Sequence, residues 1–164
     1  MDPMKLFDFS GKVIIITGAA GAIGSEAARQ LALYGANVAL TDINEDKVKA
    51  VAAKIQAETG RECIGVAADA TKEEDLKALV DTVVAKFGKI SGLINNVGWG
   101  KATPLWGSDT DKMVASYELN TVSAYNMTKY CMPYLRKEPN ASVVFSGSMV
   151  GDTPSPEFIE YSTA

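Results

Sequence analysis

Short hydrophobic runs alternate with amphipathic segments along this chain. The runs at 13–16, 37–41, 63–67, 90–94 and 142–145 predict five strands. The first reads Val-Ile-Ile-Ile, and a continuous β-branched run of this kind is typical of a strand buried on both faces. No internal repeat or low-complexity linker divides the pattern.

Helical spacing predicts helices between these strands. They cover 22–34, 44–58 and 111–135, with another opened by a capping box at 71–74 and a last one starting near Glu157. Alternating strands and helices indicate a parallel sheet with right-handed crossovers. We therefore predict an α/β, doubly wound parallel sheet of the Rossmann type as one domain over 1–164.

Composition removes several functional classes. The chain has 164 residues, a net charge of −4 and no histidine, so His-based triads and His-ligated metals are excluded and no metal site is predicted. Cys63 and Cys131 are isolated and are expected to be inert buried thiols. The absence of a basic stripe argues against nucleic acid as a partner.

The N-terminal residues and the hydropathy of the chain give no sign of a signal peptide or a membrane-spanning segment. Residues 1–10 contain no apolar leader segment, and no apolar run reaches membrane-span length. We expect a soluble, cytoplasmic protein with no membrane partner.

A glycine-rich turn follows the first strand and opens the first helix. It runs from Thr17 to Gly24 and contains the candidate cofactor residues Gly18, Gly21, Ala22, Ile23 and Gly24. Such a turn lets the backbone approach a pyrophosphate, which the helix N-terminus then binds through free N–H groups. A purely structural tight turn is the alternative.

Asp42 ends the second strand, eighteen residues after Gly24. A carboxylate there can hold a ribose 2′-hydroxyl, and it would repel the 2′-phosphate of NADP. No Arg or Lys in the turn or directly after Asp42 offsets that charge, so NAD is the predicted cofactor. The alternative is that Asp42 merely caps the next helix.

With these motifs the chain resembles the short-chain dehydrogenase/reductase family over essentially its whole length. The resemblance rests on motifs in the family's order: the glycine turn, Asp42, Asp69, the segment Asn95-Asn96-Val97-Gly98, Asn120, Ser148, and Tyr161 thirteen residues after Ser148.

The resemblance implies a role for each residue. Asp69 and Ala70 line the adenine pocket, and Asn96 and Gly98 lie beside the ribose. Asn120 kinks the long helix and holds a water of a proton relay. Ser148 binds the substrate oxygen, and Tyr161 is the general acid/base. A phenol has a reference pKa of about 10, so it needs nearby positive charge to act near neutral pH.

Three departures from the family pattern stand out. Ala22 occupies a usual glycine position, and Val97 replaces an alanine. The third concerns the family's lysine, which comes four residues after the tyrosine: the chain stops at Ala164, one residue short of it. We therefore expect an incomplete domain whose C-terminal strands and helices are missing, with the fifth strand as an exposed edge.

The resulting hypothesis is an NAD(H)-dependent oxidoreductase interconverting a secondary alcohol and a ketone. Its small-molecule substrate would be hydroxysteroid-, sugar-acid- or polyol-like, and the resemblance implies a homodimer or homotetramer for the full-length form. Two alternatives remain: a dinucleotide-binding sensor or partner-binding module without catalysis, and an inactive fragment. Taken singly, Ser148 could equally satisfy loop backbone groups, and Tyr161 could be a packing residue.

Overall fold

The computed structural model describes residues 7–164, so most of the N-terminal segment that lacks an apolar leader lies outside the described residues. The strands are β1 (Val13–Thr17), β2 (Asn37–Asp42), β3 (Cys63–Ala67), β4 (Gly92–Asn95) and β5 (Ser142–Phe145). The helices are α1 (Ala22–Leu33), α2 (Glu45–Thr59), α3 (Glu73–Phe87), α4 (Thr110–Tyr117), α5 (Ser123–Leu135), α6 (Met149–Asp152) and α7 (Ile159–Thr163), with a short 3₁₀ turn η2 (Leu105–Gly107) and a π-helical segment η3 (Glu118–Val122).

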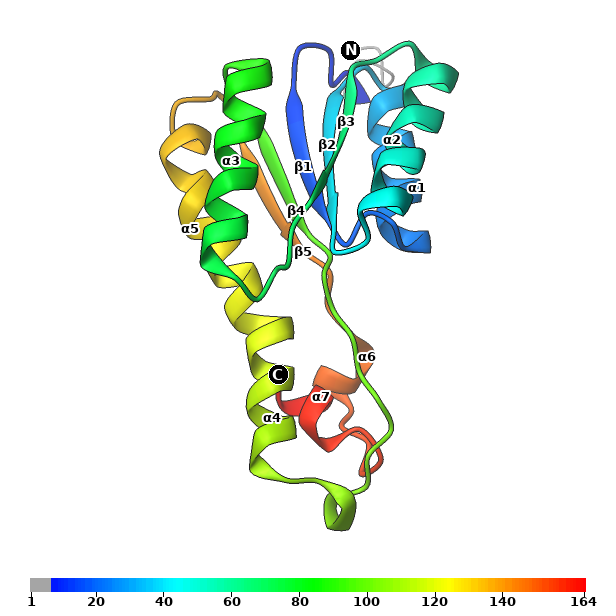
Figure 1. Ribbon diagram of the computed structural model, residues 1–164, viewed down its shortest axis with the longest axis vertical. Coiled ribbons are helices and arrows are strands. Elements are labelled where there is room, and N and C mark those ends of the chain that lie inside the picture. Colours follow the sequence, from blue (N-terminus) through cyan, green and yellow to red (C-terminus); the bar gives the residue numbers. More distant parts are fainter. Residues whose placement is uncertain (1–6) are drawn as a thin grey trace.

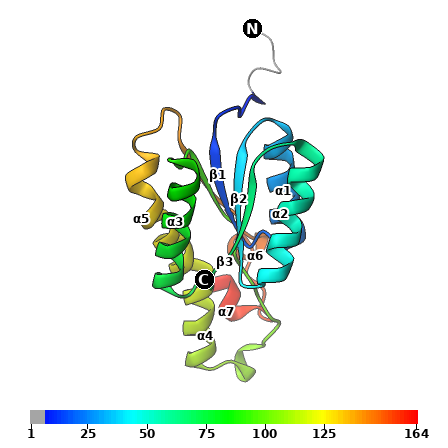
Figure 2. The same cartoon turned by 45° about the horizontal axis from the view of Figure 1, so that its top comes forward.

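The five strands form one parallel sheet in the order β3-β2-β1-β4-β5. Helices α1 and α2 cover one face, and α3 and α5 cover the other (Figures 1 and 2). This arrangement confirms the predicted doubly wound Rossmann-type fold. The chain reverses its direction across the sheet between β1 and β4, and such switch points are where open α/β sheets bind ligands.

The central strand β1 explains why two cores form. Val13 and Ile15 face the cluster beneath α3 and α5, whereas Ile14 and Ile16 face the cluster beneath α1 and α2. All four side chains are buried. The continuous β-branched run therefore reflects a strand that packs on both faces.

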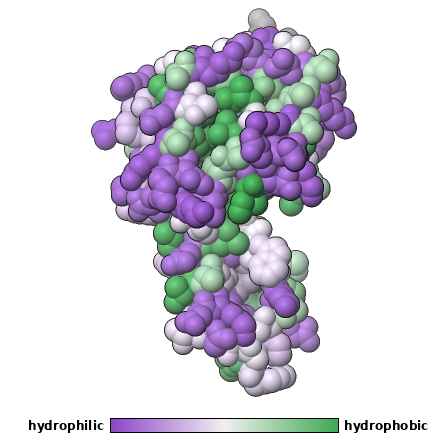
Figure 3. Space-filling view, in the orientation of Figure 1, coloured by the Kyte–Doolittle hydropathy of each residue, from purple (hydrophilic) through white to green (hydrophobic). Residues whose placement is uncertain are grey.

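The two edges of the sheet differ from this centre. In Figure 3 a band of hydrophobic side chains runs over β3, between the hydrophilic surfaces of α2 and α3. At the other edge, Val144 and Phe145 of β5 are 51% and 59% exposed. The expected exposed edge at the fifth strand is thus confirmed.

A smaller lobe projects beyond the carboxyl ends of the strands (Figure 1). It consists of α4, α6, α7 and the loop that follows β4. The N–H of Thr103 in this loop donates to the carbonyl of Glu157 at 2.6 Å, and Thr103 forms a parallel bridge with Phe158. These bonds attach the loop to the segment that precedes α7.

One local prediction was wrong. The N-cap of α3 is Lys72, not Thr71, because the Thr71 hydroxyl donates to Asp69 instead of accepting from the helix. The helix predicted at 111–135 is present as a continuous helical stretch of α4, η3 and α5, with the π-helical segment and Asn120 in its middle, whereas the short helix α6 was not predicted. Within residues 7–164, no helix is long and apolar enough to cross a membrane.

Gly65 of β3 allows α2 to pack closely on the sheet. A Cβ at this position would lie 2.6 Å from the carbonyl oxygen of Val48 and 2.8 Å from the Cα of Lys49. Because these are backbone atoms, Gly65→Ala must displace α2. We expect it to lower the free energy of unfolding by about 1–3 kcal/mol in urea denaturation.

Gly147→Ala is the matched control, since a Cβ there meets no atom within 4 Å. Equal stabilities of the two variants would show that the close packing of β3 on α2 is unimportant.

Candidate functional site

A cavity of about 570 Å³ opens at the carboxyl ends of the strands, at the switch point between β1 and β4. Nine of the ten cofactor residues predicted from the sequence line it: Gly18, Gly21, Ala22, Ile23, Asp42, Asp69, Ala70, Asn96 and Gly98. We call this cavity the first cavity. The nine residues lie at the carboxyl ends of four different strands or in the segments that follow them, and only the parallel sheet brings them together.

The three glycines of the turn have different roles. Gly18 has a φ of +62°, a conformation that favours glycine. Gly24 is buried and does not line the cavity. Its role is in packing, since a Cβ there would lie 2.7 Å from the Gly18 carbonyl oxygen. At Gly21 the nearest atom to a Cβ is 3.4 Å away, so the protein itself would tolerate a methyl group.

Asp42 joins the glycine turn to the end of β2. One carboxylate oxygen accepts the N–H of Ala20 at 3.0 Å, and the other accepts the N–H of Asn44 at 3.1 Å. The N-cap of α2 is Asn44, which accepts from Lys47, so the helix-cap alternative for Asp42 is wrong. Each carboxylate oxygen retains acceptor capacity toward the cavity.

Asp69 enters the cavity as a carboxylate. The Thr71 hydroxyl and the Thr71 N–H both donate to it, at 2.7 and 3.0 Å. These bonds, with the nearby Lys72 ammonium, hold the pKa of Asp69 below its usual 3.8. The first cavity therefore carries two acidic side chains, Asp42 and Asp69, and no Lys or Arg appears in its described lining.

Thr17 and Asn96 connect β1 to β4 at the base of the cavity. The Thr17 hydroxyl accepts the N–H groups of Asn96 and Val97 at 2.9 and 3.1 Å. In return, the Asn96 amide donates to the carbonyls of Thr17 and Gly18 at 3.1 and 3.3 Å. Asn96 thus holds the first two carbonyl groups of the glycine turn in position. Sequence reasoning missed Thr17 as a site residue, because a threonine that ends a strand carries no distinctive signal.

Asn120 lies in η3 and fastens the loop after β4 to the long helix. Its Oδ1 accepts the N–H of Trp99 at 2.9 Å, and its Nδ2 donates to the carbonyls of Trp99 and Ser116 at 3.1 and 2.9 Å. In a regular α-helix the Ser116 carbonyl accepts the backbone N–H of residue 120. Here the side chain supplies a donor, as expected where an extra residue widens a helical turn.

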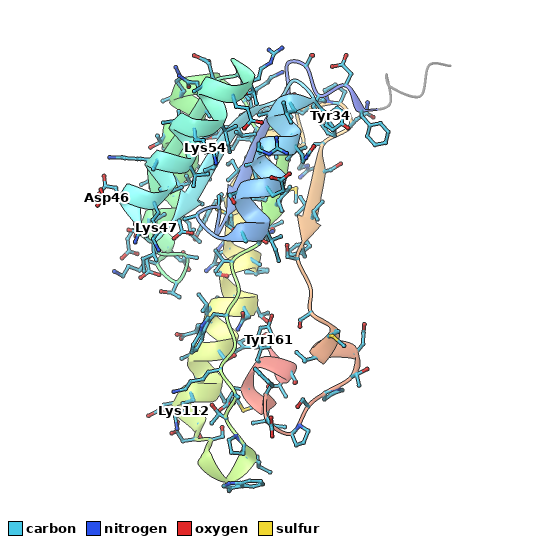
Figure 4. The ribbon with its side chains drawn as sticks, turned by 90° about the vertical axis from the view of Figure 1, so that its right-hand side faces the viewer. Tyr34, Asp46, Lys47, Lys54, Lys112 and Tyr161 are labelled. Carbon is cyan, nitrogen blue, oxygen red and sulfur yellow. The ribbon has the colours of Figure 1, made fainter. Side chains whose placement is uncertain are left out.

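Tyr161 lines a second cavity of about 560 Å³, which we call the second cavity. Its ring packs on the backbone of Gly100, where a Cβ would lie 2.5 Å from the Tyr161 Cγ. Figure 4 shows Tyr161 projecting from α7 toward this loop. Trp99 lines both cavities and is 62% exposed, so the two cavities adjoin at its side chain.

Ser148 stands apart from both cavities. It is exposed, and its hydroxyl accepts the N–H of Val150 at 3.4 Å as the N-cap of α6. The structure brings Asn120 and Tyr161 to the same loop, but it places Ser148 outside both cavity linings. Cys63 and Cys131, which were predicted to be inert buried thiols, are free and buried, and burial raises the pKa values of their thiols to about 11 and about 12.

Comparison with known proteins decides the family. A model of the short chain dehydrogenase family matches residues 12–164, which is nearly the whole chain. The chain belongs to the short chain dehydrogenase family. It is 33% identical over 154 residues to the 7alpha-hydroxysteroid dehydrogenase of Escherichia coli, covering 94% of this chain and 60% of that protein.

Other short chain dehydrogenases give the same picture. The chain is 31% identical over 158 residues to the 11-beta-hydroxysteroid dehydrogenase of Pinus massoniana, covering 96% of this chain and 44% of that protein. The structure of an NAD⁺-bound xylitol dehydrogenase superposes with a TM-score of 0.89 at 33% identity, covering 94% of this chain and 60% of that one. The chain thus spans about half the length of the relatives it matches.

The Thr17–Asn96 connection has a stability consequence. Thr17→Val keeps the shape of this buried side chain but removes the acceptor of two N–H groups. We expect it to lower the free energy of unfolding by about 1–3 kcal/mol, because buried donors without acceptors are costly. Chemical denaturation measures the change, and Thr17→Ser, which keeps the hydroxyl, should lose much less. A Val variant as stable as the Ser variant would contradict this role.

Proposed function

We propose that this protein is an NAD(H)-dependent oxidoreductase that interconverts a secondary alcohol and a ketone. The observation that carries the proposal is the convergence of nine predicted cofactor residues on one cavity at the switch point. Membership of the family supports the reaction class, since the relatives named above are dehydrogenases of hydroxysteroids and of a polyol.

The residues of the first cavity fit a dinucleotide. The N-terminus of α1 and the bare backbone at Gly21 would receive the pyrophosphate, because free N–H groups and the helix dipole favour an anion there. Asp42 at the end of β2 would accept hydrogen bonds from the adenosine ribose. The acidic lining favours NAD over NADP, whose additional phosphate would meet the charge of Asp42.

The bound cofactor would supply hydride acceptance and donation. Tyr161 would move the hydroxyl proton of the substrate at its phenolic oxygen, and the adjoining cavities would let substrate and nicotinamide meet near Trp99. Asn120 would hold the Trp99 backbone in place. Ser148 remains a proposed substrate-binding residue, and its present bond to Val150 is long enough to exchange easily.

Titration of the chain with NAD⁺ and NADP⁺, followed by protein fluorescence, tests the cofactor assignment. We expect NAD⁺ to bind more tightly than NADP⁺. Asp42→Asn should weaken NAD⁺ binding about 10-fold, because it removes a charged acceptor. It should also reduce the difference in affinity between NAD⁺ and NADP⁺. Asp46→Asn is the control, since Asp46 lies on the outer surface of α2 (Figure 4).

Gly21→Ala provides a second, steric variant in the same assay. The fold tolerates the methyl group, so thermal stability should change little while NAD⁺ affinity falls. Unchanged NAD⁺ affinity in both Asp42→Asn and Gly21→Ala would refute the assignment of the first cavity.

Single-turnover hydride transfer to NAD⁺, with protein in excess and a panel of secondary alcohols, tests the role of Tyr161. Tyr161→Phe should lower the rate at least about 100-fold, the usual contribution of a general acid/base. Because phenylalanine preserves the packing on Gly100, the thermal stability and the NAD⁺ affinity of the Tyr161→Phe variant should equal those of the parent.

Tyr34→Phe is the matched control, because Tyr34 lies at the opposite end of the molecule (Figure 4). A rate that survives Tyr161→Phe would rule out the proton-transfer role. Tight NAD⁺ binding without transfer to any alcohol would favour a dinucleotide-binding sensor.

A further inference from the structure

Glu160 is a buried carboxylate that the proposed reaction does not use. Its side chain comes from α7, next to Tyr161, and the residue is only 6% exposed. The Glu160 Oε1 atom is enclosed and has no hydrogen-bond partner among residues 7–164. Buried polar atoms in native proteins are nearly always paired, so an unpaired carboxylate oxygen calls for an explanation.

The surroundings of Glu160 are those of a binding site. Glu160 lines the second cavity together with Tyr161, Ser116 and Lys112. The backbone of Glu160 is held by α4, because the Ser116 hydroxyl donates to its carbonyl oxygen at 3.2 Å. Glu160 therefore lines an open volume directly next to the proposed acid/base, and its backbone is held in place by α4.

Lys112, one of the two cations of the lining, is paired with groups other than Glu160. The Lys112 ammonium lies 2.8 Å from the Asp109 carboxylate and donates to the Gly107 carbonyl at 2.9 Å. Its place on α4 is visible in Figure 4. No residue among 7–164, Lys101 of the lining included, donates to the Glu160 Oε1 atom, which leaves a molecule that enters the second cavity as a source of the donor.

The charge of the lining selects the kind of donor. Lys101 and Glu160 contribute one charge of each sign, and the Lys112 ammonium is already paired with Asp109. The Glu160 carboxylate is a strong acceptor for a neutral hydroxyl group, which adds no further charge to this balanced lining. We propose that Glu160 binds a second hydroxyl of the substrate, so that the second cavity selects alcohols carrying at least one hydroxyl besides the reacting one.

This inference rests on the proposed function and narrows its substrate class to diols and polyols. A substrate with its reacting hydroxyl at Tyr161 would place the additional hydroxyl at Glu160. A site built to bond a hydroxyl discriminates strongly against the analogue that lacks it, because its buried acceptor is then left unpaired.

Ligand-observed NMR on the full chain, with NAD⁺ present, tests this directly. The probes are cyclohexanediols with hydroxyls on adjacent, alternate or opposite carbons, compared with cyclohexanol and cyclohexylamine. We expect at least one diol to bind most tightly. Glu160→Leu should weaken that diol about 10- to 100-fold and leave cyclohexanol unchanged or tighter.

Two further variants keep the result interpretable. Glu160→Gln retains a carbonyl acceptor and should lose only part of the diol affinity. Glu157→Leu, an exposed neighbour in the same segment, should not alter the preference. Thermal unfolding is expected to show Glu160→Leu at least as stable as the parent, because it removes an unpaired buried charge.

Each outcome bears on one proposal only. Equal effects of Glu160→Leu on diol and cyclohexanol, no diol binding at all, or tighter binding of cyclohexylamine would overturn the role of Glu160. If the parent chain does not bind NAD⁺ but still prefers a diol to cyclohexanol, the proposed function would be refuted, whereas the role of Glu160 in binding a hydroxyl would be supported.

Discussion

The reciprocal bonding of Thr17 and Asn96 is the constraint on which the candidate site depends. One hydroxyl accepts two consecutive N–H groups from the chain leaving β4, and one amide returns two bonds to the chain leaving β1. Strands β1 and β4 pair side by side, and the chain segments that leave them line the first cavity, so the junction lies at the base of that cavity. Its bond to the Gly18 carbonyl also ties the junction to the glycine turn that leads to α1.

The loop after β4 extends this constraint to the second cavity. Asn120 bonds both the N–H and the carbonyl of Trp99, so the π-helical segment and the loop hold one another. Gly100, the next residue, has no side chain and receives the Tyr161 ring. The two cavities therefore meet along one short backbone segment, which explains how a cofactor in one and a substrate in the other could come into contact.

Much of the first cavity was predictable, because its residues follow from local rules. A glycine turn between a buried strand and a helix, and an acid at the end of the next strand, each have a recognisable spacing. Gly24 shows the limit of such rules. The glycine motif predicts that Gly24 contacts the cofactor, whereas in the structure Gly24 lets α1 pack closely against the glycine turn. For Ser148, the spacing to Tyr161 predicts a role but does not say which cavity the side chain lines, and Ser148 lies outside both linings.

The sequence by itself determined the succession of strands and helices along the chain, the two-sided core and the residue types of the candidate cofactor site, because hydrophobic periodicity and turn chemistry are local properties. Only the tertiary structure decided which groups share a cavity and which are left without partners. Thr17 is an ordinary strand-ending threonine until β4 is placed beside it. Glu160 is an ordinary glutamate until α7 packs on α4 and removes it from water, and burial of that kind is a property of distant contacts.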